Sequence, residues 1–138
     1  MKRIGLVAVV IAVLVGAFLL LSKPAHSPEI SKQPTAKLSF ATVQNEASKG
    51  SAFLIDVRTA EEYAAGHFPS AINHSLQDIQ AAKYPKLAKD TPIYLYCNSG
   101  NRSGQAAKLL KEAGYTVITD LGGIDDVKAM GGKLTKQP

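Results

Sequence analysis

Cys97 is the single cysteine of this 138-residue chain, and it stands where an expected strand ends and an expected helix begins. The apolar run 93–96 precedes it, and the helix-like stretch 105–113 follows it, closed by Gly114. The N-terminus of a helix leaves main-chain N–H groups unpaired and carries partial positive charge. A thiolate at such a position has a lowered pKa, and the same N–H groups can hold an anion. The position therefore predicts a nucleophile beside an anion-binding site.

The loop that begins at this cysteine is small, polar and cationic. Gly100 permits main-chain angles that other residues avoid, so that successive N–H groups can point inward. Arg102 adds a permanent positive charge with planar donors suited to an oxyanion. The candidate anion-binding residues follow Cys97 directly: Asn98, Ser99, Gly100, Asn101, Arg102 and Ser103.

The loop sequence contains no histidine and no acid, so it offers no general base. A thiolate that is already formed needs no base, and a leaving group that is a stable anion needs no proton. Transfer of a sulfane sulfur meets both conditions. In that reaction the thiolate attacks, a sulfite-like anion leaves, and Cys97 holds a persulfide.

The elements around this loop alternate between strands and helices. A capping-box pattern at Thr59 and Glu62 predicts the start of one helix. The alternation predicts an α/β domain with a parallel sheet, whose ligand crevice lies beyond the carboxyl ends of the strands, where Cys97 falls by sequence order. Strands are expected at 53–57, 71–73, 93–96 and 115–119, helices at 42–48, 59–65, 103–113 and 125–130, and a helical or irregular connector at 76–89.

The first 37 residues differ from the rest of the chain. Lys2 and Arg3 precede an uncharged apolar run that extends from residue 4 to residue 21. Residues 1–21 are interpreted as a signal peptide or a signal-anchor helix, and residues 22–37, with their prolines and serines, as an extended tether. Residues 38–134 form the expected globular domain. With either kind of leader, the basic N-terminus stays inside and the domain crosses the membrane.

The charge and the titratable residues exclude several classes of function. The formal net charge is +5, but beyond residue 27 there are 13 basic residues against 11 acidic ones. The lysines are scattered, without an arginine cluster or interleaved aromatic residues, which gives nucleic-acid binding no support. A lone cysteine cannot form an internal disulfide, and His26, His67 and His74 are not at ligand spacing, so no metal site is expected.

Four stretches resemble, in the same order, the rhodanese domain: 54–63 (LIDVRTAEEY), 66–73 (GHFPSAIN), 96–103 (YCNSGNRS) and 121–124 (LGGI). With the leader, the chain most resembles the exported phage-shock rhodaneses of bacteria. The resemblance implies a three-layer αβα fold with a mostly parallel central sheet.

The same resemblance implies thiosulfate sulfurtransferase activity without a cofactor. Cys97 would carry the sulfur, and the loop main chain would hold the anion. The donor would be thiosulfate or a persulfide, and the acceptor cyanide or a thiol. The expected location is the periplasmic side of the bacterial cell envelope, either anchored to the inner membrane through an uncleaved leader or released.

Three charged residues are expected to support the loop from outside it: Asp56, Arg58 and Glu62. Asp56, at a strand end, is interpreted as a capping or ion-pairing residue. Arg58 and Glu62 lie four residues apart at a helix start, which favours a structural role. Two roles stay open for Arg102, contact with the substrate or an ion pair with Asp56 or Glu62.

Two other functions compete with sulfur transfer. Phosphatases and arsenate reductases use related loops, but in those phosphatases the arginine is the sixth residue after the cysteine, whereas Arg102 is the fifth after Cys97. The shorter loop makes a tighter cradle, and it holds no acid that could protonate an alkoxide leaving group. The leader, the tether and the small domain also fit a membrane-tethered module that delivers sulfur to, or docks on, another envelope protein.

Overall fold

The computed structural model describes residues 37–136. The expected leader, residues 1–21, and all but the last residue of the expected tether, 22–37, lie outside the described residues. Among the residues that are described, no helix combines the length and the apolar character needed to cross a membrane. The expected domain bounds, 38–134, stay a prediction.

A four-stranded parallel sheet forms the centre of the fold. The strands are β1 (Phe53–Asp56), β2 (Ala71–Asn73), β3 (Ile93–Tyr96) and β4 (Ile118–Asp120). They lie in the order β2-β1-β3-β4, and every neighbouring pair is parallel. The expected α/β fold with a parallel sheet is confirmed. In the register, Asp56 is the partner of Tyr96, and Leu95 is the partner of Asp120, so β1, β3 and β4 end at one edge of the sheet.

Within residues 37–136, five helices connect and cover these strands. They are α2 (Phe40–Ser48), α3 (Ala60–Ala65), α4 (Leu76–Gln80), α5 (Asn101–Glu112) and α6 (Ile124–Ala129). The predicted capping box is present: the Thr59 hydroxyl accepts from the Glu62 N–H, and the Glu62 carboxylate accepts from the Thr59 N–H. This reciprocal pair satisfies two main-chain donors and fixes the start of α3.

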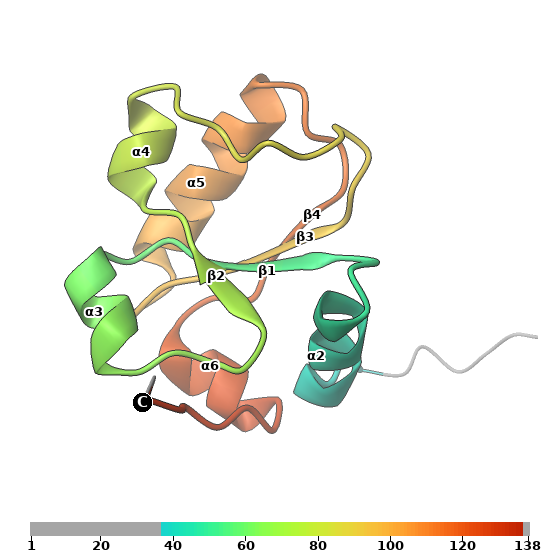
Figure 1. Ribbon diagram of the computed structural model, residues 1–138, viewed down its shortest axis with the longest axis vertical. Coiled ribbons are helices and arrows are strands. Elements are labelled where there is room, and N and C mark those ends of the chain that lie inside the picture. Colours follow the sequence, from blue (N-terminus) through green and yellow to red (C-terminus); the bar gives the residue numbers. More distant parts are fainter. Residues whose placement is uncertain (1–36, 137–138) are drawn as a thin grey trace, which may run out of the picture. The chain divides into compact units, whose positions relative to one another are not determined.

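The helices lie on both faces of the sheet, which gives three layers (Figure 1). Helices α4 and α5 bury Leu76, Ile79 and Leu110 against one face, where Ile55 and Leu95 point. Helices α2 and α6 pack on the other face, and α3 contributes Tyr63 to that layer. The hydrophobic core on this face contains Phe40, Val43, Leu54, Phe68, Ala71, Tyr96, Leu121 and Val127.

Several element boundaries differ from the sequence-based expectation by one to three residues, and two of these differences have a clear local cause. The strand expected at 115–119 begins only at Ile118, because Tyr115 follows the end of α5 and its side chain turns into the core, where its hydroxyl donates to the Pro85 carbonyl. Helix α5 begins at Asn101 rather than Ser103, because Gly100 adopts the left-handed conformation that ends the loop two residues earlier.

Candidate active site

Cys97 directly follows β3 at the edge of the sheet where β1 and β4 also end. Its main-chain N–H donates to the Gly122 carbonyl over 3.1 Å, which joins the start of the loop to the segment that follows β4. The side chain is fully buried and packs with the core between the sheet and α5. The sulfur therefore lies at the base of the loop, below the first turn of the helix.

The turn from the strand into α5 depends on Gly100. Its φ angle of +88° lies in the left-handed region, where a side chain is strained. Its N–H donates to the Cys97 Sγ over 3.0 Å. An added Cβ would lie 3.4 Å from the Gly122 Cα, an ordinary van der Waals contact, so it is the main-chain conformation that favours glycine.

Ser103 supports the loop from within the first turn of α5. This residue is fully buried, and its hydroxyl donates to the Gly100 carbonyl over 3.0 Å and, more weakly, to the Gly122 carbonyl over 3.4 Å. The hydroxyl thus connects the loop to the β4–α6 segment. Because both carbonyls are main-chain groups, the contact fixes the path of the loop.

The surroundings of Cys97 lower the pKa of its thiol. Burial acts in the opposite direction, since it disfavours the charged thiolate. Hydrogen bonding from the main chain and hydroxyl of Ser103, and from the N–H groups of Ser99 and Gly100, outweighs burial. The site therefore favours a thiolate at the N-terminus of a helix, as expected for a nucleophile.

A paired-glycine segment, Gly122-Gly123, supports the loop from its other side. The Ile124 N–H donates to the Asn98 carbonyl over 3.1 Å, and Gly123 forms an isolated bridge with Ser99. A Cβ on Gly123 would lie 2.8 Å from the Asn98 carbonyl oxygen, so only glycine fits without a shift of the loop. Sequence reasoning did not include these glycines among the site residues, although their pairing before α6 in the stretch 121–124 was the available signal.

Arg102 forms its ion pair with Glu62, at the start of α3. Arg102 Nη1 donates to Glu62 Oε2 over 2.7 Å, and Nη2 donates to Oε1 over 2.8 Å. The side chains are 28% and 35% exposed, which places the pair at the rim of the site. The arginine lowers the pKa of Glu62 to about 2 through these hydrogen bonds. Of the partners left open by the sequence, the structure selects Glu62 and not Asp56.

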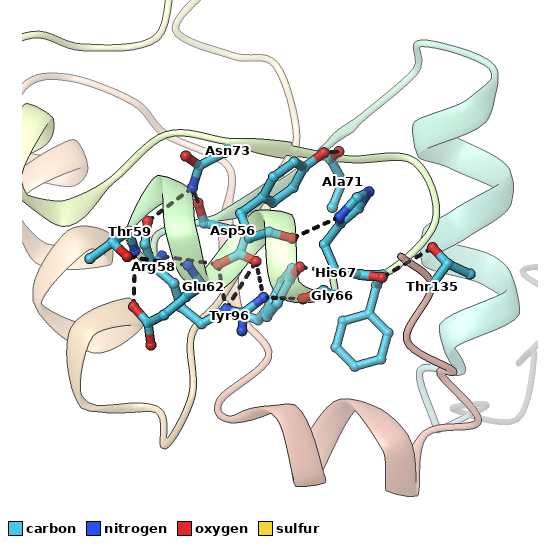
Figure 2. Close-up of polar contacts among 12 residues, drawn as sticks. Asp56, Arg58, Thr59, Glu62, Gly66, His67, Ala71, Asn73, Tyr96 and Thr135 are labelled. Atoms are coloured by element: carbon cyan, nitrogen blue, oxygen red, sulfur yellow. Dashed lines mark hydrogen bonds and ion pairs between the residues drawn. The ribbon is translucent and has the colours of Figure 1, made fainter. Parts of the chain in front are cut away.

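Asp56 and Arg58 form a second, buried ion pair (Figure 2). Arg58 Nη2 lies 2.6 Å from Asp56 Oδ2 and 2.7 Å from the Gly66 carbonyl oxygen, and the Arg58 Cζ lies 5.8 Å from the centre of the Tyr96 ring. Asn73 donates to the main-chain carbonyls of both partners. Within residues 37–136, no hydrogen bond connects this pair to the 97–103 loop. The pair therefore stabilises the segments next to the carboxyl ends of β1 and β2.

The remaining predicted residues lie on the exposed side of the loop. The side chains of Asn98 and Ser99 are exposed, and Asn101 accepts a hydrogen bond from Gln105 one turn along α5. His67 lies apart from the loop, stacked on Tyr63, and its main chain pairs with Thr135. The part of the chain that the structure describes contains no group of three or more residues suited to a metal.

Comparisons with known proteins agree with one another. The sequence model of the rhodanese-like domain matches residues 39–130. The thiosulfate sulfurtransferase PspE of Escherichia coli (strain K12) is 40% identical over 76 residues, which are 53% of this chain and 71% of that protein.

Two solved structures show the same fold. A rhodanese from E. coli, solved with anions, is 35% identical with a TM-score of 0.52, over 62% of this chain and 99% of that one. The Alr3790 protein from Anabaena sp. is 27% identical with a TM-score of 0.61, over 72% of this chain and 82% of that one.

Proposed function

Because the chain belongs to the family of rhodanese-like domains and is therefore a sulfurtransferase, we propose that Cys97 carries a sulfane sulfur from thiosulfate, or from a persulfide, to cyanide or a thiol. The observation that carries the proposal is the position of the Cys97 sulfur. It lies 3.0 Å from the Gly100 N–H, at the start of α5, and its pKa is lowered.

The chemistry of the first step is balanced without a base or a cofactor. The Cys97 thiolate attacks the outer sulfur of thiosulfate, an S–S bond forms at the cysteine, and the S–S bond of thiosulfate breaks. Sulfite leaves with the electron pair of the broken bond. The persulfide that remains on Cys97 is anionic, and the partial positive charge at the start of α5 favours an anion there.

Thiosulfate is favoured as donor by two observations on relatives. The E. coli PspE protein is a thiosulfate sulfurtransferase, and a rhodanese from E. coli was solved with anions. A loop that directs main-chain N–H groups at a sulfur near a helix N-terminus suits an anionic donor.

The alternative of a phosphatase is less consistent with the site. A phosphatase loop uses its arginine to hold the oxyanion, whereas both terminal nitrogens of Arg102 are engaged with Glu62. The loop also lacks an acid that could protonate an alkoxide.

The test is the mass of the intact full-length protein after incubation with thiosulfate. We expect a gain of one sulfur atom, which cyanide removes with release of thiocyanate. A Cys97→Ser variant should show no gain. Absence of sulfur uptake by the wild-type protein from thiosulfate and from a persulfide would contradict the proposal. Hydrolysis of an aryl phosphate that Cys97→Ser abolishes would favour the phosphatase instead.

The sequence also supports export of the protein. We propose that the basic residues Lys2 and Arg3 and the apolar run that follows direct the domain to the periplasmic side of the inner membrane. Fractionation of cells that express the full chain should recover the domain from the envelope. Deletion of residues 1–27 should retain it in the cytoplasm, and an unchanged distribution would contradict export.

A further inference from the structure

The Arg102–Glu62 pair differs from an ordinary surface ion pair because its carboxylate has a second hydrogen-bond partner. Glu62 Oε2, which accepts from Arg102, also accepts from the Thr59 N–H over 3.0 Å as part of the capping box of α3. The carboxylate is therefore held in place by its own helix, independently of the arginine. Most exposed ion pairs contribute little because two mobile side chains must be ordered, and here one of the two is already fixed.

This pair determines the charge at the rim of the loop. Arg102 is the only cationic residue in the sequence 97–103. Its guanidinium is close enough to Cys97 that the pKa of Arg102 is raised by Glu62 first and also by the charge of the Cys97 thiolate. With Glu62 ionised, the positive charge of the loop is cancelled by a carboxylate 2.7 Å away.

We propose that Glu62 is a specificity-determining residue: by cancelling the charge of Arg102 at the rim of the Cys97 loop, it reduces the advantage of doubly charged sulfur donors and admits singly charged ones. The inference rests on the proposed sulfurtransferase function and concerns which class of donor that site accepts. An anion of charge −2 gains twice as much as an anion of charge −1 from an uncompensated cation at the same distance. Neutralisation of Arg102 therefore reduces the difference in electrostatic attraction between doubly charged and singly charged donors.

Two donors that differ mainly in charge separate this effect from general damage to the loop. Thiosulfate carries two negative charges, and an arenethiosulfonate carries one, with an aryl group in place of one oxygen. Both present an outer sulfur on an S–S bond. In each case the Cys97 thiolate takes that sulfur, and sulfite or sulfinate leaves with the electron pair. A loosened loop slows both reactions, whereas a change of charge alters the ratio of their rates.

The experiment measures kcat/KM of the full-length protein for each donor, with cyanide as acceptor. For Glu62→Gln we expect the ratio of thiosulfate to arenethiosulfonate to rise at least about threefold at low salt, which one unit of charge supplies over several ångströms. The rise should shrink at high salt, since exposed charges are screened. Arg102→Gln leaves the Glu62 carboxylate unpaired and should change the ratio in the opposite direction.

Glu61→Gln provides the matched control. Glu61 precedes Glu62 in the first turn of α3 and is exposed, and within residues 37–136 its carboxylate forms no ion pair with Arg102. The variant removes the same charge from the same helix, and the donor ratio should stay at the wild-type value.

Each outcome decides the inference. Equal loss of both rates in Glu62→Gln, with an unchanged ratio, would overturn it and leave Glu62 as a structural brace. If that variant does not fold by circular dichroism, the ratio in Arg102→Gln decides in its place: a fall supports the inference, and no change overturns it. If wild-type Cys97 gains no sulfur from thiosulfate, from a persulfide or from the arenethiosulfonate, the proposed function fails first, and the inference falls with it.

Discussion

The main-chain N–H of Gly100 lies 3.0 Å from the Cys97 sulfur and donates a hydrogen bond to it. The contact exists because Gly100 adopts a left-handed conformation just before α5 begins at Asn101. The N–H groups of Ser99 and Ser103 also lower the pKa of the thiol, so main-chain donors surround the sulfur at the start of the helix. This relationship stabilises the thiolate form of the cysteine.

We expect the Cys97 thiol to ionise at lower pH than an unstructured cysteine. Burial opposes ionisation, but hydrogen bonds from the loop outweigh it and lower the pKa. The rate of alkylation by iodoacetamide should therefore rise with an inflection at a lower pH than that of an unfolded thiol. The absolute rate will be slow because the sulfur is buried, but the inflection is independent of access. The same chain in urea is the reference, and an equal or higher inflection in the folded protein would contradict the expectation.

Removal of the Ser103 hydroxyl should raise the pKa of Cys97. The hydroxyl is one of the groups that lower this pKa, and it also donates to the Gly100 carbonyl. Ser103→Ala should move the alkylation inflection to higher pH and destabilise the fold by about 1 kcal/mol. Ser48→Ala, which removes an exposed hydroxyl bonded to the Asn45 carbonyl, should leave the inflection unchanged. If Ser103→Ala also leaves it unchanged, the main-chain N–H groups of Ser103, Ser99 and Gly100 suffice without the hydroxyl.

Much of this arrangement can be predicted from the sequence, because it depends on local patterns. The apolar runs around Leu54 and Leu95, the capping box at Thr59, and the glycine after Cys97 each act within a few residues. The partner of Arg102 cannot be predicted in the same way, since Glu62 is 40 residues away and its position depends on how α3 packs. The start of β4 is not predictable for a related reason. Tyr115 fits the apolar pattern of a strand, but it precedes β4 and its hydroxyl contacts Pro85, 30 residues away in the sequence.

The close approach of Gly123 to the loop predicts a specific sensitivity. A Cβ at this position would lie 2.8 Å from the Asn98 carbonyl oxygen and 3.0 Å from the Ser99 Cα, both main-chain atoms of the loop. Gly123→Ala should displace the loop and reduce the rate of sulfur loading on Cys97 by about tenfold or more. Intact mass after short incubations with thiosulfate measures that rate.

The control for this substitution is Gly104→Ala. Gly104 lies in α5, and its added Cβ would meet only the Asp120 carboxylate, at 3.5 Å. Replacement of glycine by alanine inside a helix should stabilise the fold by about 0.5–1 kcal/mol. Wild-type loading in Gly123→Ala would show that the loop tolerates the shift.

The buried Asp56–Arg58 pair should be important for stability. Asp56 is fully buried, and Arg58 is 5% exposed. Asp56→Ala leaves the guanidinium buried without its carboxylate, which should cost about 3–5 kcal/mol of the free energy of unfolding. Urea denaturation measures this loss. Asp125→Ala is the control. It removes a carboxylate that is paired with Lys128 but whose side chain is 97% exposed, and it should change stability by less than about 0.5 kcal/mol. Similar losses of unfolding free energy in the two variants would contradict the expectation that the buried pair contributes more to stability than the exposed one.

The Arg102–Glu62 pair predicts how stability depends on acid. Glu62 has an ordinary pKa of 4.5, which Arg102 lowers to about 2 in the folded protein. A carboxylate with a lowered pKa in the folded state stabilises the fold fully above its unfolded pKa, and loses that effect as the pH falls through the folded value. The contribution should therefore be constant at neutral pH and disappear between about 4.5 and about 2. Because both side chains are about a third exposed, solvent screening limits the contribution of the pair to less than about 1 kcal/mol.

The difference in unfolding free energy between wild type and Glu62→Gln, measured in urea at several pH values, should decrease between pH 4.5 and about pH 2 and also decrease at high salt. A wild-type advantage that persists unchanged at pH 2 would mean that packing or capping, not the ion pair, is what Glu62 contributes.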